Sequence, residues 1–239
     1  MQRVSVSTVP SASVGKTARF TLLVGIGLVV VLTAYGIIRF PLIVNLAPVE
    51  SLIYLIIFAL LLIGYGWYGL RQTNSRAQST TYILGQGLFF GLVIGLLWVI
   101  EVVTGNLNFA NADWANVLYF GSMLVVLIVT FAAGFRGAQQ SARTIAGIQV
   151  GLWSGMISSL ITFIALMLIT YLFQAKLQAI PQNMQEYLRS GAPDFTTYLV
   201  SDSLAGATNH LWIGPFLGLV IGGIGSVIGK ALANSASKL

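Results

Sequence analysis

The chain has 239 residues, of which 56% are hydrophobic, and only 12 basic and 6 acidic side chains carry a formal charge. A soluble domain has about a quarter of its residues charged, so this composition excludes a water-soluble globular protein. The chain has no cysteine, which excludes disulfides, a thiolate nucleophile and cysteine-ligated metals.

Six apolar runs follow one another along the chain, at residues 21–38, 52–70, 82–104, 116–135, 146–173 and 211–229. Each is close to the length of about 20 helical residues that crosses a hydrocarbon core of about 30 Å. The predicted fold class is therefore all-α, a polytopic membrane protein with six transmembrane helices in a domain spanning residues 21–230. Residues 1–20 are predicted to be a disordered tail rich in Ser, Thr and Ala, and residues 231–239 a second short tail.

The charges divide between the two sides that these runs define. One side has nine basic residues and no acidic one, namely Arg3, Lys16, Arg19, Arg71, Arg76, Arg136, Arg143, Lys230 and Lys238. The other side has three basic residues and all six acidic ones. Because excess Lys and Arg mark the cytoplasmic side, we expect a multi-pass protein of the cell membrane with both termini cytoplasmic. This distribution is typical of orientation in a bilayer and does not indicate a nucleic-acid partner.

The connections are short except for a polar outer loop at residues 174–208. Within it Leu177, Ile180, Met184 and Leu188 fall at helical spacing. This pattern favours a helix that lies on the membrane surface with its apolar face down. A lid or a partner-docking element is the alternative.

The odd and even runs each show an internal similarity. The third and fifth runs share Gly-Leu-aromatic-x-Gly, at Gly87–Gly91 and Gly151–Gly155, offset by 64 residues. The second and fourth runs end in Gly69-Leu70-Arg71 and Gly134-Phe135-Arg136, offset by 65 residues. Matching offsets in both sets predict three repeated helical hairpins that each start in the cytoplasm. Chance similarity among glycine- and leucine-rich helices is the alternative.

Small residues recur every fourth position in three of the runs, which places them on one helix face. The candidate packing residues are Gly87, Gly91 and Gly95; Gly151, Gly155 and Ser159; Gly214, Gly218 and Gly222; and, by the repeat offset, Gly27. Such a glycine zipper lets helix backbones approach closely and gain van der Waals contact. A narrow pore lined by these faces is the alternative interpretation.

Polar groups are sparse inside the runs. Ser154, Ser158 and Thr162 lie on one side of the fifth run and are candidates for lining a polar cavity. The competing interpretation is that each hydroxyl bonds to a carbonyl one turn earlier in its own helix. Glu101 and Arg39, near the outer ends of their runs, form a candidate interfacial pair.

Aromatic residues gather near the cytoplasmic end of the second run. Tyr65, Trp67 and Tyr68 are typical of the aromatic belt that anchors a helix at the interface.

The residues do not favour catalysis. Intramembrane serine proteases with six spans need a Gly-x-Ser-Gly nucleophile, whereas this chain has Leu152-Trp153-Ser154-Gly155. The single histidine, His210, is expected at the opposite membrane surface from Ser154, so the two would lie beyond hydrogen-bond reach. One histidine and scattered acids do not supply a metal site, so we predict no enzyme, no catalytic residue, no metal and no cofactor.

Three functions remain for a chain of this kind. We expect a non-catalytic membrane subunit or scaffold, packed through its glycine faces, whose partners are the lipid bilayer and either further copies of itself or another membrane subunit. The alternative is a small-solute channel or the membrane component of a transporter, with a cavity bounded by the third, fifth and sixth runs. An intramembrane enzyme is the interpretation that the residues favour least.

Overall fold

The computed structural model describes residues 11–46, 48–73, 78–107 and 112–236, and no strand occurs within them. The helices of these ranges are α1 (Ser11–Arg39), α2 (Leu42–Leu46), α3 (Pro48–Thr73), α4 (Gln78–Leu107), α5 (Ala112–Ser141), α6 (Thr144–Leu172), α7 (Gln174–Gln178), α8 (Pro181–Ser190) and α9 (Phe195–Ala236).

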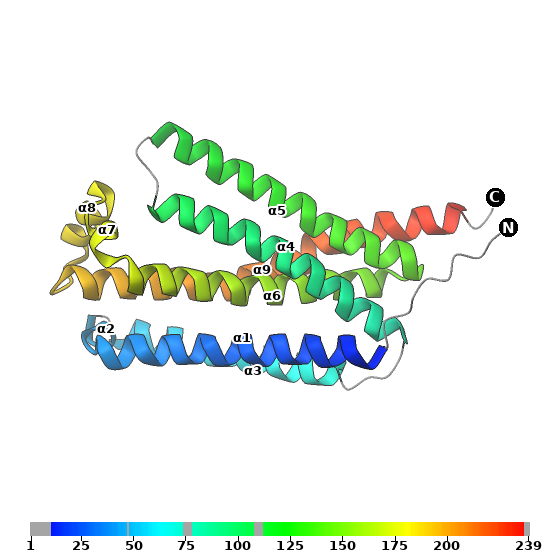
Figure 1. Ribbon diagram of the computed structural model, residues 1–239, viewed down its shortest axis with the longest axis horizontal. Coiled ribbons are helices and arrows are strands. Elements are labelled where there is room, and N and C mark those ends of the chain that lie inside the picture. Colours follow the sequence, from blue (N-terminus) through cyan, green and yellow to red (C-terminus); the bar gives the residue numbers. More distant parts are fainter. Residues whose placement is uncertain (1–10, 47, 74–77, 108–111, 237–239) are drawn as a thin grey trace.

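Six of these helices, α1, α3, α4, α5, α6 and α9, are long and apolar enough to cross a membrane. Consecutive long helices run in opposite directions, so the start of α1 and the end of α9 lie at the same end of the molecule (Figure 1). The predicted fold class is confirmed: the chain is all-helical and has six helices of membrane-spanning length.

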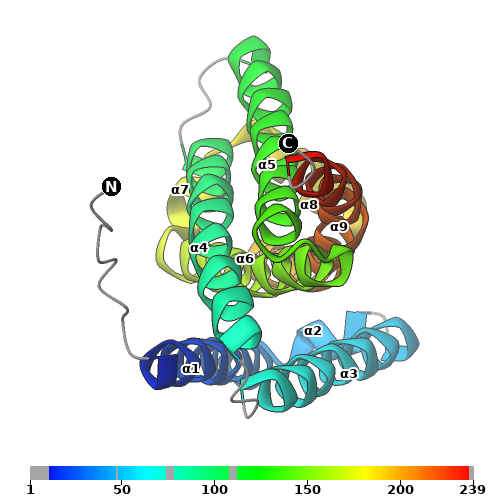
Figure 2. The same cartoon turned by 90° about the vertical axis from the view of Figure 1, so that its right-hand side faces the viewer.

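Helix α6 occupies the centre of the bundle. It packs against α9, α4, α5 and α1, and its side chains Val150, Trp153, Phe163 and Met167 are fully buried. Figure 2 shows α4, α5 and α9 gathered around α6, with α1 and α3 forming a layer below them. In lipid, burial of such side chains brings little hydrophobic gain, because lipid tails are as apolar as leucine. The bundle is therefore held mainly by van der Waals contact and hydrogen bonds between helices.

The repeat is not confirmed. Three equivalent hairpins would present equivalent partners, but α6 of the third pair sits in the middle of the other helices. The third pair also differs in carrying α7 and α8 between its long helices and in the 42-residue length of α9. The triplication remains a prediction from the sequence.

The last membrane helix begins earlier than expected. The sequence places its first residue at 211, whereas α9 starts at Phe195 and continues through Pro215. Apolar and aromatic residues at the start of α9 explain the difference, because Phe195, Leu199 and Val200 are buried in the bundle. Their polar neighbours give this stretch the composition of a loop, although one face of it packs as a helix.

The outer loop also differs from the predicted surface helix. Leu177, Ile180, Met184 and Leu188 do not share one helix, since α7 ends at Gln178 and α8 starts at Pro181. Leu177 is 1% exposed in a cluster with Phe195, while Ile180 and Met184 pack against that cluster. Three of the four apolar side chains therefore face the protein, and only Leu188, at 73% exposed, points away from it.

Asp194 caps the first turn of α9. One carboxylate oxygen accepts a hydrogen bond from the Thr197 backbone N–H at 2.8 Å, and the other accepts from the Thr197 hydroxyl at 2.7 Å. The Asp194 carbonyl accepts from the Tyr198 N–H, which starts the helix ladder. These bonds, with the backbone N–H of Thr197 as the main cause, lower the pKa of the Asp194 carboxyl below its ordinary value.

Replacing Asp194 with alanine is expected to fray the first turn of α9, because a lost cap costs about 1 kcal/mol of helix stability. Since folding lowers the Asp194 pKa, the ionised cap stabilises the helix above the unfolded pKa of about 3.9, and this contribution disappears as the pH falls through the folded pKa. Hydrogen exchange of residues 195–199 would measure both effects. An Asp194→Asn variant keeps a capping oxygen that does not titrate, so its protection should not change near pH 4. Equal protection in wild type and Asp194→Ala would contradict the capping role.

Candidate functional site

The glycine faces of α6 and α9 meet backbone to backbone. A methyl group added at Gly151 would strike the Gly218 carbonyl oxygen, and one added at Gly218 would strike the Gly151 carbonyl. One turn further along, a methyl group at Gly214 would lie 2.6 Å from the Gly155 carbonyl oxygen. A real Cβ does not fit at such distances, so glycine is required at these positions for α6 and α9 to approach this closely.

Helix α9 changes partner along its length. Gly222 lies next to both α5 and α6. A methyl group added at Gly134 of α5 would strike the Gly222 backbone, and a methyl group added at Gly222 would lie 3.1 Å from the Gly151 Cα of α6. Beyond it, methyl groups at Gly225 and Gly229 would strike carbonyl oxygens of α5. The glycine stripe that starts against α6 therefore ends against α5.

Three of these contact glycines are not among the candidate packing residues predicted from the sequence. Gly134, Gly225 and Gly229 form the α5–α9 contact, and Ser226 supports it by donating hydrogen bonds to the Gly222 carbonyl at 2.7 Å and to the Gly134 carbonyl at 3.4 Å. The sequence does contain a pattern that indicates this contact. Glycines occur at positions 218, 222, 225 and 229, with spacings that alternate between four and three residues, as in a continuous helix-packing seam.

Helix α4 packs on α6 in a different manner. Added methyl groups at Gly91 and Gly95 would lie 2.7 Å from side-chain carbons of Ile157 and Ile161, and one at Gly87 would strike Trp153. Side chains of α6 spaced by four thus occupy the hollows left by glycines of α4 spaced by four. Here the shortest distances from the added methyl groups are to side chains of α6, although Gly91 also approaches the Ser154 carbonyl oxygen, at 3.1 Å.

The structure does not bring Gly27 to a helix contact. A methyl group there would meet no atom within 4 Å. The glycines of α1 that do meet other helices include Gly25, where an added methyl would lie 3.0 Å from a terminal carbon of Leu160, and Gly36, where it would strike the Tyr171 hydroxyl. Gly27 lies two residues beyond Gly25 and therefore on the opposite face of the helix, so it is not part of the packed core.

The three candidate cavity hydroxyls of α6, those of Ser154, Ser158 and Thr162, are satisfied within their own helix. Ser154 donates to the Gly151 carbonyl at 2.7 Å, Ser158 to the Gly155 carbonyl at 3.0 Å and Thr162 to the Ser158 carbonyl at 2.9 Å. All three residues are at most 1% exposed. This is the arrangement expected for hydroxyls that back-bond within a helix, and it leaves none of their protons directed into a cavity.

Pro215 leaves one backbone carbonyl of α9 without its usual partner. Proline has no N–H, so the carbonyl four residues earlier, that of Leu211, receives no intrahelical bond. The hydroxyl of Tyr65 on α3 donates a hydrogen bond to this carbonyl. Tyr65 is 5% exposed, and Ser159 lies beside its hydroxyl.

This contact changes the interpretation of the aromatic residues of α3. Trp67 is 63% exposed beside the Arg71 guanidinium, as an interfacial anchor would be. Tyr65 instead points into the protein, and Tyr68 packs on Trp153 with their ring centroids 6.2 Å apart. The nitrogen of the Trp153 indole is buried without a hydrogen-bond partner among the described residues.

The ionisable residues considered from the sequence, Arg39, Glu101 and His210, do not come together in the described structure. The Arg39 guanidinium lies 5.6 Å from the centre of the Phe40 ring, and within the described part of the chain no ion pair joins it to Glu101. His210 packs edge-on against Trp98, with ring centroids 5.0 Å apart. In the described ranges no three His, Asp or Glu side chains come together as a metal site would require.

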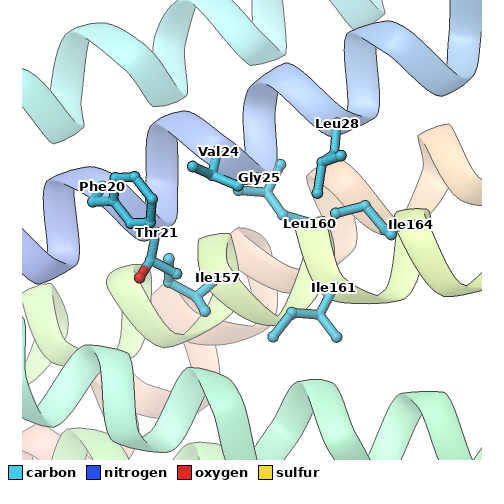
Figure 3. A pocket seen from close by; sticks show the side chains of 9 residues that line it. All are labelled: Phe20, Thr21, Val24, Gly25, Leu28, Ile157, Leu160, Ile161 and Ile164. Carbon is cyan, nitrogen blue, oxygen red and sulfur yellow. The ribbon is translucent and has the colours of Figure 1, made fainter.

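An apolar groove lies between α1 and α6, on a different side of α6 from α9. It has a volume of about 260 Å³ and is lined by α1 side chains between residues 20 and 28 and by α6 side chains between residues 157 and 164. Figure 3 shows Thr21 of α1 and Ile157 of α6 on facing sides of this groove. Thr21 supplies the polar side chain of a lining that is otherwise aliphatic, aromatic or glycine.

No family model, characterised protein or solved structure matches this chain. The arrangement of its own residues is therefore the basis for a functional conclusion. The core offers close backbone contacts and the Ser154, Ser158 and Thr162 hydroxyls bonded within α6, and the described surface offers apolar faces and an apolar groove between α1 and α6.

Proposed function

We propose that the chain is a non-catalytic membrane subunit or scaffold whose rigid core holds its outer helices in place. The observation that carries this proposal is the backbone contact of Gly151 with Gly218, repeated at Gly155 with Gly214. Contacts of this kind fix the relative position of two helices, because neither backbone can move aside. Ser154, Ser158 and Thr162 support the proposal, since their hydroxyls are bonded within α6 at the depth where a solute path would need polar groups.

Both termini are assigned to the cytoplasmic side of the cell membrane in this proposal. The start of α1 and the ends of α3, α5 and α9 lie at one end of the molecule, and they carry Lys16, Arg71, Arg136 and Lys230. All six acidic residues belong to helix ends or connections at the opposite end. An excess of Lys and Arg marks the cytoplasmic side.

Apolar stripes on α3 and α5 are the surfaces proposed for partners. Leu60 and Ile63 of α3 are 63% and 67% exposed, and Phe120 and Leu124 of α5 are 68% and 58% exposed. Helices α3 and α5 lie on opposite sides of the bundle in Figure 2. The proposed partners are further copies of the chain or another membrane subunit.

Solute flux separates this proposal from a channel or transporter. The purified full chain, reconstituted into liposomes, is expected to release trapped K⁺, Cl⁻, H⁺ and a neutral sugar no faster than liposomes without protein, with an ionophore as positive control. Flux that scales with the amount of protein would overturn the scaffold proposal and favour permeation.

A second measurement tests the partner surfaces. A photoreactive amino acid at Leu124 is expected to give a discrete protein adduct in native membranes, either a dimer of the chain or a heteromeric pair. A matched photoreactive residue at the buried Met167 should give none. Adducts with lipid alone at Leu124, at Phe120 and at Leu60 would contradict a subunit role.

A further inference from the structure

The groove between α1 and α6 opens toward the surroundings of the bundle. Its α1 wall contains Phe20, Val24 and Leu28, which are 69%, 41% and 44% exposed. Its floor includes Leu160, which is 2% exposed and lies against Gly25. In a bilayer such a surface is in contact with hydrocarbon, so an apolar chain fits it and water does not.

The dimensions of the groove match one leaflet. The lining of α1 extends from residue 20 to residue 28, a rise of about 12 Å at 1.5 Å per residue. Half of the hydrocarbon core measures about 15 Å. The groove lies in the first part of the membrane-length segment Ser13–Arg39, and therefore in the leaflet next to the end that holds the start of α1.

Basic side chains lie at the polar end of the groove. Lys16 precedes Phe20 by four residues, so it continues the groove-lining face of α1 by one turn toward the membrane surface. Lys16 and its neighbour Arg19 are both exposed. No acidic residue occurs at this end of the molecule, because all six belong to the opposite end.

From the apolar lining, the length and the charge, we propose that this groove is a binding site for an anionic phospholipid. One acyl chain lies between α1 and α6, and the phosphate of the headgroup lies against Lys16. Gly25 keeps the floor open, since a side chain at this position would press on Leu160 and fill the space that the acyl chain occupies. The lipid comes from the leaflet that borders the basic end of the protein.

Native mass spectrometry of the full chain, released from detergent with added lipid, tests this proposal. We expect one tightly retained phosphatidylglycerol and weaker retention of phosphatidylcholine with the same acyl chains. Lys16→Gln should weaken retention of phosphatidylglycerol about fivefold, the effect of one basic residue at an anionic surface. It should weaken retention of phosphatidylcholine less, because the choline of that headgroup already neutralises its phosphate. Lys230→Gln, which removes an exposed lysine at the same end of the molecule, is the matched control and should have no effect.

A filled groove tests the acyl-chain position. Thr21→Trp places a large side chain in the groove and is expected to reduce lipid retention about tenfold or more, since several buried methylenes are displaced. Leu23→Trp adds the same side chain on an exposed position of α1 that does not line the groove, and it should retain lipid as wild type does.

Two outcomes would overturn the site. Equal retention of phosphatidylglycerol and phosphatidylcholine by wild type would exclude an anionic headgroup, and equal behaviour of the two tryptophan variants would exclude the groove. If Thr21→Trp does not fold, phosphatidylglycerol carrying a diazirine on its acyl chain gives the answer in the wild-type protein. Its adducts should map to α1 residues 20–28 and α6 residues 157–164, and adducts spread evenly over all six long helices would equally reject the site.

Discussion

Replacing Gly218 with alanine is expected to lower the free energy of unfolding by about 1–3 kcal/mol or more, the usual cost of overpacking a close-packed core. The added methyl group would strike the Gly151 carbonyl oxygen and lie 2.7 Å from its carbon. Both atoms belong to a helix backbone, so no side-chain rotation relieves the contact and α6 and α9 must separate. That separation also loosens the neighbouring contact of Gly155 with Gly214. Thermal unfolding in detergent, followed by tryptophan fluorescence, measures the loss.

Gly27→Ala is the matched control for this substitution. It makes the same change in a membrane-length helix, but the added methyl group meets no atom within 4 Å. Alanine is a better helix former than glycine by about 1 kcal/mol, so the melting temperature should stay the same or rise. A similar loss of stability in both variants, or no loss in Gly218→Ala, would show that the α6–α9 backbone contact is not what holds the core.

Removing the hydroxyl of Tyr65 is expected to have the second largest effect. In Tyr65→Phe the Leu211 carbonyl, which Pro215 deprives of an intrahelical donor, would be left buried and unpaired. Such a group costs about 1–2 kcal/mol when its partner is removed, judging from buried groups in soluble proteins and hydrogen bonds in membrane helices. The same unfolding measurement detects it. Tyr54→Phe, on the same helix but at a 45% exposed position, should leave stability unchanged.

The proline offers an internal test of this explanation. Pro215→Ala restores a backbone N–H that can donate to the Leu211 carbonyl. In the Pro215→Ala background, Tyr65→Phe should therefore cost less than it does in wild type, and the difference is the coupling energy of the pair. Strict additivity of the two substitutions would mean that Tyr65 stabilises the protein through packing and not through this hydrogen bond.

The six helices could be predicted from the sequence because each carries a continuous apolar run. The spacing of Gly151, Gly155, Gly214 and Gly218 likewise indicated faces for close contact, since small residues four apart share one side of a helix. The identity of the neighbouring helix was not predictable from that spacing. Gly95 faces a side chain and Gly218 faces a backbone, although both belong to an i, i+4 pattern of glycines.

The remaining features depend on contacts between residues far apart in the chain. In the sequence Tyr65 resembles an aromatic residue at the membrane interface. Its role as a hydrogen-bond donor depends on the Leu211 carbonyl, which is 146 positions away in the chain, so the sequence alone does not reveal it. The early start of α9 is not evident from the sequence, because Asp194 just before the helix and Thr197 and Asp202 in its first turns are polar. The apolar side chains of this stretch, such as Leu199, indicate a packed helix only when the positions of α4 and α6 beside it are known.

The length of α9 sets the height of the protein above the bilayer. Its 42 residues rise about 63 Å, and even at a tilt of about 40° the vertical extent of about 48 Å exceeds the hydrocarbon thickness of about 30 Å. At least one end of α9 must therefore project from the hydrocarbon core. The N-terminal part of α9 contains the polar residues Asp202 and Asn209, so this end is expected to project. Leu177 of α7 is clustered with Phe195 and Leu199 on this projection, and Tyr187 of α8 packs against the same cluster, so both α7 and α8 are tied to it. A fluorophore at Ser190 would then stand at a fixed height above the bilayer midplane, and its distance from labelled headgroups would shorten as the membrane thickens.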